Sequence, residues 1–284
     1  GTNTYVCAIK GNFDDAQRGV KKIFTNEGIV NDFKSDNIMF SSANSINVGR
    51  LIPQIVYYFY SYMKLIDLGT IKMWDKVNFS VPTGNFGNIL AGYYAKLLGL
   101  PVNMLLCGSN ENNVLYDFIR TGIYDRNRKF YRTISPSMDI LVSSNLERFL
   151  YYVSGKNNEE VKTMMEKLNS TGRYEVNPEI KRKINDEFYA GCVFKEDTER
   201  TIREVFEKYG YLLDTHTAVA YKTLNEYRKE TGDEAAGIIM STASPFKFSG
   251  SVYESLYGAT DKNEFAIMEE LSERTGVPIP ENLK

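Results

Sequence analysis

The feature that most limits the fold is the alternation of short apolar runs with longer stretches of helical spacing. Three compact runs are expected to form strands: Val77–Val81, Asn103–Cys107 and Gly237–Met240. Apolar residues recur at spacings of three and four in stretches expected to be helical: Val48–Met63, Ile89–Leu98 and Glu264–Leu271. Strands that alternate with helices of ten or more residues indicate βαβ units. The sequence therefore predicts an α/β fold with a mostly parallel sheet flanked by helices.

Two segments are expected to lie outside this pattern. At the N-terminus, Tyr5–Ile9 is predicted to be a strand and Asp14–Thr25 a helix. Charged residues crowd the interval 156–203, which predicts solvent-exposed helices inserted into the larger unit rather than elements that cover the sheet.

Charge and cysteine content exclude several classes of function. The 284 residues carry 34 basic and 36 acidic side chains, a net charge of −2, so no basic excess indicates nucleic-acid binding. Cys7, Cys107 and Cys192 are far apart with no C-x-x-C pair, which favours reduced thiols in a cytoplasmic protein over disulfides or a metal site. A membrane span is not expected, because Lys64 interrupts the aromatic run that begins at Tyr57.

The most informative motif joins an expected strand to an expected helix through two glycines. It contains Gly84, Asn85, Phe86, Gly87 and Asn88. Glycines let the backbone approach a ligand closely, and amide groups at a helix N-terminus favour an anion such as phosphate. The loop matches neither the Walker A pattern nor G-x-G-x-x-G. An anion site held by main-chain amides is therefore predicted, with a ligand-free glycine turn as the alternative.

Polar residues also precede the expected helix at Val48. Asn44 lies in a segment rich in N-cap residues, and capping needs no ligand. Arg50 lies beside apolar positions and is expected to need a partner, either an acidic side chain or a bound anion.

Two later segments place hydroxyl groups or histidine at the end of a strand or the start of a helix. Thr242 follows the expected strand at Gly237–Met240, where open α/β sheets bind ligands, although a plain turn also explains the residues there. Asp214, His216 and Thr217 begin a helix, and a helix cap is the simpler explanation for them. No G-x-S-x-G elbow accompanies this single histidine, so a Ser-His-Asp hydrolase is disfavoured.

Together these segments resemble the threonine synthases of fungi and many bacteria. The runs that carry the resemblance are Gly11–Gln17, Ser42–Gln54, Val81–Asn88, Leu100–Val102, Asp214–Ala220, Thr242–Phe248 and Val277–Pro280. They follow the order found in that family over nearly the whole chain.

The resemblance implies a fold type II enzyme that uses pyridoxal 5′-phosphate (PLP). The residues it assigns to the cofactor phosphate are Gly84, Asn85, Phe86, Gly87 and Asn88. Thr242 would hydrogen-bond the pyridine nitrogen, where a neutral hydroxyl makes the ring a weaker electron sink than a carboxylate would. Ser244 stands where the family more often has histidine, which leaves Thr242 unaffected.

The resemblance also implies a substrate and a reaction. Asn44 and Arg50 would bind the phosphate of O-phosphohomoserine, and His216 and Thr217 would line the substrate pocket. The implied reaction removes the γ-phosphate and adds water at Cβ, giving L-threonine in amino-acid biosynthesis.

The Schiff-base lysine of the family lies upstream, in a Phe-Lys-Asp segment that these residues do not contain. No catalytic residue is therefore assigned, and Lys247 is interpreted as structural rather than as a substitute. The resemblance implies that residues 1–41 are the remnant of a smaller domain and 42–284 the larger cofactor-binding domain. The chain is then expected to be inactive without its missing N-terminal segment.

Two alternative functions share these motifs. One is a phospho-lyase related to threonine synthase that degrades phosphorylated hydroxy-amino acids. The other is a catalytically silent module that keeps a phosphate or PLP site.

Overall fold

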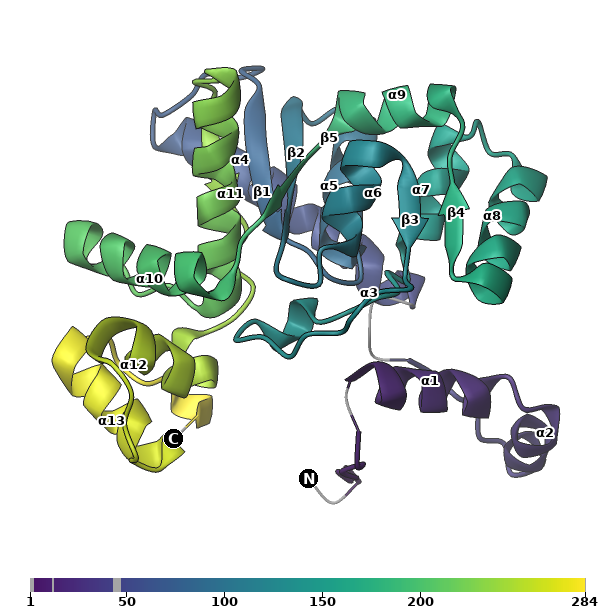
Figure 1. Ribbon diagram of the computed structural model, residues 1–284, viewed down its shortest axis with the longest axis horizontal. Coiled ribbons are helices and arrows are strands. Elements are labelled where there is room, and N and C mark those ends of the chain that lie inside the picture. Colours follow the sequence, from purple (N-terminus) through teal and green to yellow (C-terminus); the bar gives the residue numbers. More distant parts are fainter. Residues whose placement is uncertain (1–2, 12, 43–46, 284) are drawn as a thin grey trace.

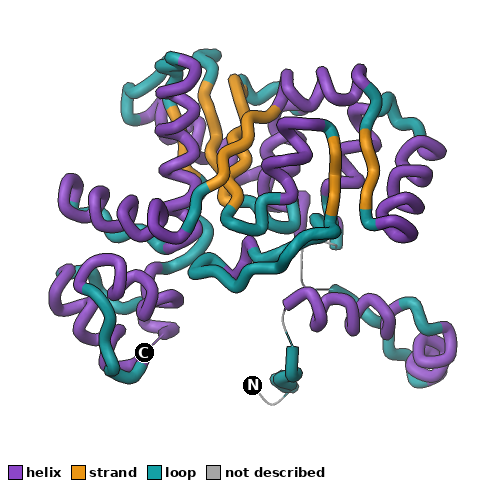
Figure 2. The backbone as a smooth tube through the Cα atoms, in the orientation of Figure 1, coloured by secondary structure: helices purple, strands orange, loops and turns teal. Residues whose placement is uncertain are grey.

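A four-stranded parallel sheet forms the centre of the computed structural model, which describes residues 3–11, 13–42 and 47–283 (Figures 1 and 2). The strands, in sheet order, are β5 (Phe188–Cys192), β2 (Val102–Ser109), β1 (Val77–Pro82) and β6 (Gly237–Ile239). The α/β class and the parallel sheet flanked by helices are therefore confirmed.

Strand β1 lies inside the sheet, between β2 and β6, and all six of its residues are buried. A parallel sheet is covered by helices on both faces, so its inner strands read as continuous apolar runs. Val81 is in register with Cys107 of β2, and Ser80 with Ile239 of β6. The carboxyl ends of these three strands consequently meet at one edge of the sheet, where ligands of open α/β sheets bind.

Helices cover the two faces of the sheet (Figure 1). Helix α11 (Thr215–Thr231) packs on one face, where Leu224 and Tyr227 join Leu106 in an apolar cluster. The opposite face carries α5 (Gly87–Leu97), α4 (Ile55–Asp67) and α6 (Val114–Thr121), which share the main core with Leu105.

A second apolar cluster lies beside the sheet, where three helices pack together: α10 (Lys195–Tyr209), α12 (Ser249–Tyr257) and α13 (Glu264–Thr275). Its fully buried side chains are those of Ile202, Ala218, Val252 and Leu271.

The remaining elements surround this frame. The helices are α1 (Phe13–Phe24), α2 (Glu27–Ser35), α3 (Val48–Leu51), α7 (Leu146–Val153), α8 (Asn158–Thr171) and α9 (Pro178–Glu187). The 3-10 turns are η1 (Ile52–Gln54), η2 (Pro136–Met138), η3 (Pro245–Phe248) and η4 (Glu281–Leu283). A separate antiparallel pair joins β3 (Ile123–Asp125) to β4 (Arg173–Glu175). No helix in the described ranges is both long and apolar enough to span a bilayer.

Three expectations about secondary structure are wrong. Tyr5–Ile9 forms no strand, and Val6 is 95% exposed with no neighbouring strand to hydrogen-bond it. The interval 156–203 is not an exposed insertion throughout, because β5 lies within it and forms one edge of the main sheet. The helix expected from Val48 to Met63 is interrupted by η1. This turn contains Pro53, which lacks the N–H that a continuous helix requires.

The three thiols differ in exposure, which predicts a labelling pattern. Burial raises the pKa of Cys107 to about 12 and that of Cys192 to about 12, whereas Cys7 is exposed. Because the thiolate is the reactive form, a disulfide reagent at pH 8 is expected to modify Cys7 quickly, and Cys107 and Cys192 slowly, in the native chain. Cys7→Ser should remove the fast phase, and denaturant should make all remaining thiols react. A fast phase that survives in Cys7→Ser would contradict this prediction.

Candidate functional site

The loop between β1 and α5 presents an uncapped helix N-terminus. Phe86 is the N-cap residue of α5, its backbone is left-handed (φ 62°), and its side chain makes no cap hydrogen bond. The first N–H groups of a helix have no partner inside that helix. Since no side chain of the cap supplies one here, these amides and the helix dipole can bind an anion.

The ring of Phe86 anchors this loop in the core. It is 2% exposed, and its centroid lies 5.4 Å from that of Phe188 and 5.9 Å from that of Phe149. Burying a phenylalanine stabilises a fold by about 1.5–3 kcal/mol, enough to offset the roughly 1–2 kcal/mol cost of a left-handed backbone at a residue with a Cβ. The uncommon backbone conformation is therefore held by packing.

Neighbouring side chains bind the carbonyl groups of the loop. Ser143 Oγ donates to the Gly84 carbonyl at 2.9 Å, and Asn145 Nδ2 donates to the Asn85 carbonyl at 2.8 Å. Ser144 Oγ also donates to Asn85 Oδ1 at 3.2 Å. These contacts occupy acceptor groups of the loop and leave its donors for a ligand. We call the backbone amides from Gly84 to Asn88 the cradle.

Asn88 is oriented by a buried tyrosine. Tyr58 Oη donates to Asn88 Oδ1 at 2.8 Å and lies the same distance from the Asn88 carbonyl. Burial raises the pKa of Tyr58 well above its ordinary value, so the phenol keeps its proton. With its side-chain oxygen engaged, Asn88 has the Nδ2 donor left for a ligand.

Gly84 permits a close approach between two loops. A Cβ at this position would lie 2.6 Å from the carbonyl oxygen of Ser137 and 3.2 Å from Cα of Met138. Both are backbone atoms, which cannot move aside as a flexible side chain could. The cradle therefore lies directly against the η2 turn, and only glycine fits at that contact.

Two adjoining cavities lie at this edge of the sheet and share Gln54 and Asn88. The first, about 590 Å³, is lined by the loop from Pro82 to Ile89 and by Gln54, Pro136, Ser137, Lys247 and Phe248. The second, about 800 Å³, is lined by Gly49, Arg50, Pro53, Gln54, Tyr57, Ser61, Asn88, Ile239, Met240, Ser241 and Thr242. Among the described residues that line them, the charged ones are Lys247 and Arg50, both positive. The site therefore favours anions.

The structure brings most of the expected residues together. The glycine loop lines the first cavity, whereas Arg50 and Thr242 line the second. Met240 N donates to the Ser80 carbonyl at 2.9 Å, which places the segment leading to Thr242 beside the end of β1. Asn44 lies outside the residues that the structure describes.

The expected surroundings of Arg50 are wrong. Its side chain is exposed, and neighbouring Val48 and Ile52 are 54% and 53% exposed. In the four-residue helix α3 only Leu51 is buried, so Leu51 is the position of this helix that packs into the core. An anion partner for Arg50 is therefore not required by burial, although its place in the second cavity leaves it available to one.

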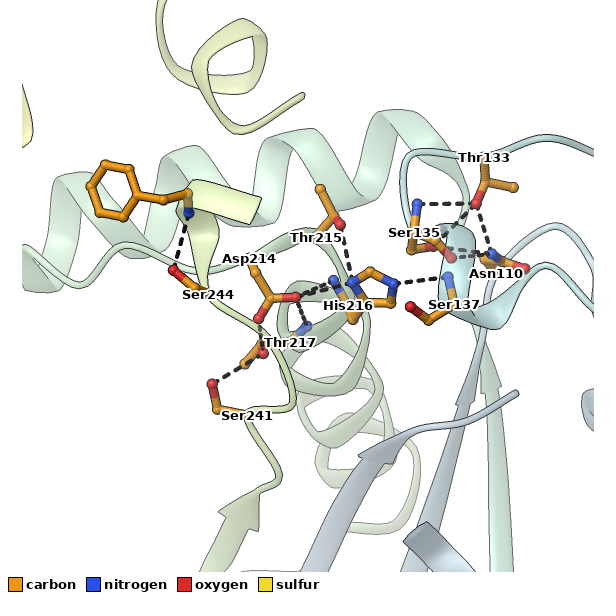
Figure 3. Close-up of polar contacts among 11 residues, drawn as sticks. Asn110, Thr133, Ser135, Ser137, Asp214, Thr215, His216, Thr217, Ser241 and Ser244 are labelled. Carbon is orange, nitrogen blue, oxygen red and sulfur yellow. Dashed lines mark hydrogen bonds and ion pairs between the residues drawn. The ribbon is translucent and has the colours of Figure 1, made fainter. Parts of the chain in front are cut away.

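His216 and Thr217 do not line either cavity. They are 2% and 3% exposed and lie at the buried start of α11, where His216 faces Ser137 (Figure 3). That they line the substrate pocket therefore stays a prediction. Asp214 caps this helix by accepting from the backbone N–H groups of both residues, at 2.8 Å and 3.2 Å.

Sequence reasoning assigned no binding role to four residues that build the site. Gln54 lines both cavities, Ser137 and Lys247 line the first, and Asn145 binds the loop. Gln54 and Lys247 lie in runs that carry the family resemblance. Ser137 and Asn145 lie in an irregular stretch without periodicity, and only the folded chain shows that they meet the loop.

Comparison with known proteins agrees with this architecture. Residues 217–279 match the family model described as "Threonine synthase, C-terminal". The chain is 38% identical over 256 residues to human "Threonine synthase-like 1", covering 89% of this chain and 34% of that protein. It is 36% identical over 270 residues to threonine synthase of Saccharomyces cerevisiae, covering 90% of this chain and 51% of that protein.

Solved structures give the same result. A PLP-bound threonine synthase from Brucella melitensis superposes with a TM-score of 0.77 at 35% identity, covering 92% of this chain and 54% of that one. Threonine synthase from yeast superposes with a TM-score of 0.79 at 34% identity, covering 97% and 53%. The chain thus spans about half the length of these threonine synthases. Along nearly its whole length it is similar to the threonine synthases in sequence and fold, and residues 217–279 match the model of their C-terminal part.

Proposed function

We propose that this chain is the cofactor-binding part of a PLP-dependent lyase of the threonine synthase type. The observation that carries the proposal is the uncapped N-terminus of α5, joined to a glycine loop in a cavity whose charged lining residues are positive. A phosphate dianion fits such a place, and the Brucella relative is a PLP-bound threonine synthase.

The residues present fit the cofactor's phosphate. Backbone amides from Gly84 to Asn88 and the Asn88 side chain would hold it, and Lys247 adds a positive charge to the same cavity. Thr242 lines the adjoining cavity and would donate its hydroxyl to the ring nitrogen. PLP supplies the electron withdrawal that the elimination of phosphate and the addition of water require.

The substrate that we propose is O-phosphohomoserine, with L-threonine and phosphate as products. Arg50, in the second cavity, would bind the substrate phosphate as a bidentate donor, and the proposal extends this role to Asn44. The proposal keeps His216 and Thr217 near the substrate pocket, although both are buried in this chain, at 2% and 3% exposure.

We further propose that residues 1–41 belong to a smaller domain and that activity needs a lysine-bearing segment from outside these 284 residues. The yeast and Brucella threonine synthases are about twice as long as the chain, which is consistent with such a segment. A related phospho-lyase would use the same site, and only the reaction product distinguishes the two activities.

Equilibrium dialysis of the 284-residue chain against PLP tests the cofactor site. We expect binding at least about tenfold tighter than that of pyridoxal, because charge-assisted hydrogen bonds to the phosphate are lost without it. Inorganic phosphate should compete with PLP. Equal affinity for PLP and pyridoxal, or no competition by phosphate, would refute the proposed site.

A second experiment tests the substrate assignment in the full-length protein that contains this chain. Arg50→Ala is expected to raise KM for O-phosphohomoserine at least about tenfold, since one charged hydrogen-bond partner is lost. Arg182→Ala is the matched control, because Arg182 is exposed and forms only a surface pair with Asp186 of α9. Threonine should be the product, and a keto acid in its place would favour the phospho-lyase.

A further inference from the structure

The η2 turn that borders the cradle is held from two sides (Figure 3). On one side, Asp139 accepts from Thr133 N at 2.9 Å and from Thr133 Oγ1 at 2.7 Å, while Asn110 Nδ2 donates to Ser135 Oγ at 3.0 Å. On the other side, the backbone N–H of Ser137 donates to His216 Nε2 at 3.2 Å. The histidine thus reaches a loop 79 residues away in the chain.

These contacts favour one tautomer of the imidazole. Nε2 accepts a hydrogen bond from a backbone amide, so it carries no proton. Nδ1 lies 3.1 Å from Asp214 Oδ1, and a carboxylate only accepts, so Nδ1 carries the proton. Thr215 Oγ1 also lies 3.3 Å from Nδ1, so this geometry favours the tautomer with its hydrogen on Nδ1.

The same buried cluster reaches the other cavity. The Thr217 hydroxyl donates to Asp214, and its oxygen lies 3.3 Å from Ser241 Oγ, which can donate to it. Ser241 lines the second cavity next to Thr242. Asp214, His216 and Thr217 thus connect the turn that borders the phosphate loop to the segment that carries Thr242.

We propose that His216 is a positioning residue that sets the depth of the phosphate cradle by holding Ser137 against Gly84. This inference rests on the proposed function and adds to it. The Ser137 carbonyl oxygen lies where a Cβ of Gly84 would be, at 2.6 Å from that point, so any displacement of η2 changes the room beside the cradle. Packing of the imidazole on Phe248, with centroids 4.7 Å apart, keeps the ring in place. Phe248 also lines the first cavity.

The wild-type chain tests the protonation state directly. The chain has one histidine, so ¹⁵N labelling of histidine gives a single pair of ring signals. We expect the chemical shifts of the tautomer with hydrogen on Nδ1 and with Nε2 as the acceptor. A ring protonated at Nε2, or at both nitrogens, would overturn the proposal without any variant having to fold.

Affinity for PLP then tests the positioning role. His216→Phe removes the acceptor, leaves the Ser137 amide without a partner, and is expected to weaken PLP binding about tenfold. His216→Gln places an amide oxygen near the position of Nε2 and should restore binding to within about threefold of the unchanged chain. Hydrogen exchange of the Ser137 amide should accelerate in His216→Phe and not in His216→Gln.

Tyr227→Phe is the matched control. Tyr227 lies on the same helix and donates to Asp233 at 3.0 Å near the helix's other end, so its loss also removes a part-buried hydrogen bond. We expect lower stability with unchanged PLP affinity. Equal PLP affinity in His216→Phe and the unchanged chain would refute the positioning role of His216 but not the proposed function. Failure of the unchanged chain to bind PLP would instead refute the proposed function.

Discussion

Replacing Gly84 with alanine is expected to weaken PLP binding by the 284-residue chain about 100-fold. The added Cβ would lie 2.6 Å from the Ser137 carbonyl oxygen, so either the cradle or the η2 turn must move. Overpacking of this kind costs about 1–3 kcal/mol of stability, and every 1.4 kcal/mol lost from binding is tenfold in affinity. Equilibrium dialysis measures the affinity, and urea denaturation measures the free energy of unfolding.

Gly250→Ala is the control for this substitution. Gly250 lies in helix α12, and a Cβ there meets no atom within 4 Å. Alanine should raise stability by up to about 1 kcal/mol through its helix propensity and leave PLP affinity unchanged. If Gly84→Ala binds PLP as tightly as Gly250→Ala does, the close contact between the loop and the η2 turn does not contribute to PLP affinity.

Replacing Asp214 with alanine is expected to lower the free energy of unfolding by about 3–5 kcal/mol. Its carboxylate caps α11 and also holds the imidazole of His216 and the hydroxyl of Thr217, all in a buried setting. Loss of a cap costs about 0.5–2 kcal/mol, and each buried group left without a partner adds about 1–3 kcal/mol. Urea denaturation of the purified chain measures the change.

Asn157→Ala provides the comparison. Asn157 caps α8 by accepting from Glu160 N at 3.2 Å, in an exposed position. Its loss should cost about 1 kcal/mol, because water replaces the missing acceptor. An equal cost for the two variants would show that the buried cluster around Asp214 adds nothing beyond an ordinary helix cap.

Local patterns predicted the elements that build the cradle. Val77–Val81 forms most of β1, and the glycine loop leads into α5, because apolar spacing and turn chemistry act over a few residues. The strand expected at Tyr5–Ile9 is wrong because a strand needs a partner, which local composition does not report. Pro53 was visible in the sequence, and its missing N–H explains the 3-10 turn where one long helix was expected.

Contacts over long sequence separations could not be predicted from these patterns. The pairing of Ser137 with His216 spans 79 residues, and that of Asn145 with Asn85 spans 60. Neither pair has a spacing signal, since the fold alone brings the loops together. The burial of His216 was equally invisible in the sequence, because a cap motif marks a helix start without showing how deeply that start is buried.

The position of Phe86 has a consequence for genetic screens. Its ring belongs to the aromatic core with Phe149 and Phe188, while its main chain forms the rim of the anion cradle. If the amides of this loop bind the ligand as proposed, substitutions that loosen this cluster will shift those amides without touching the ligand. Random mutagenesis scored by loss of activity should return interior aromatic positions alongside the residues that contact cofactor, and distance from the ligand will be a poor guide to which changes matter.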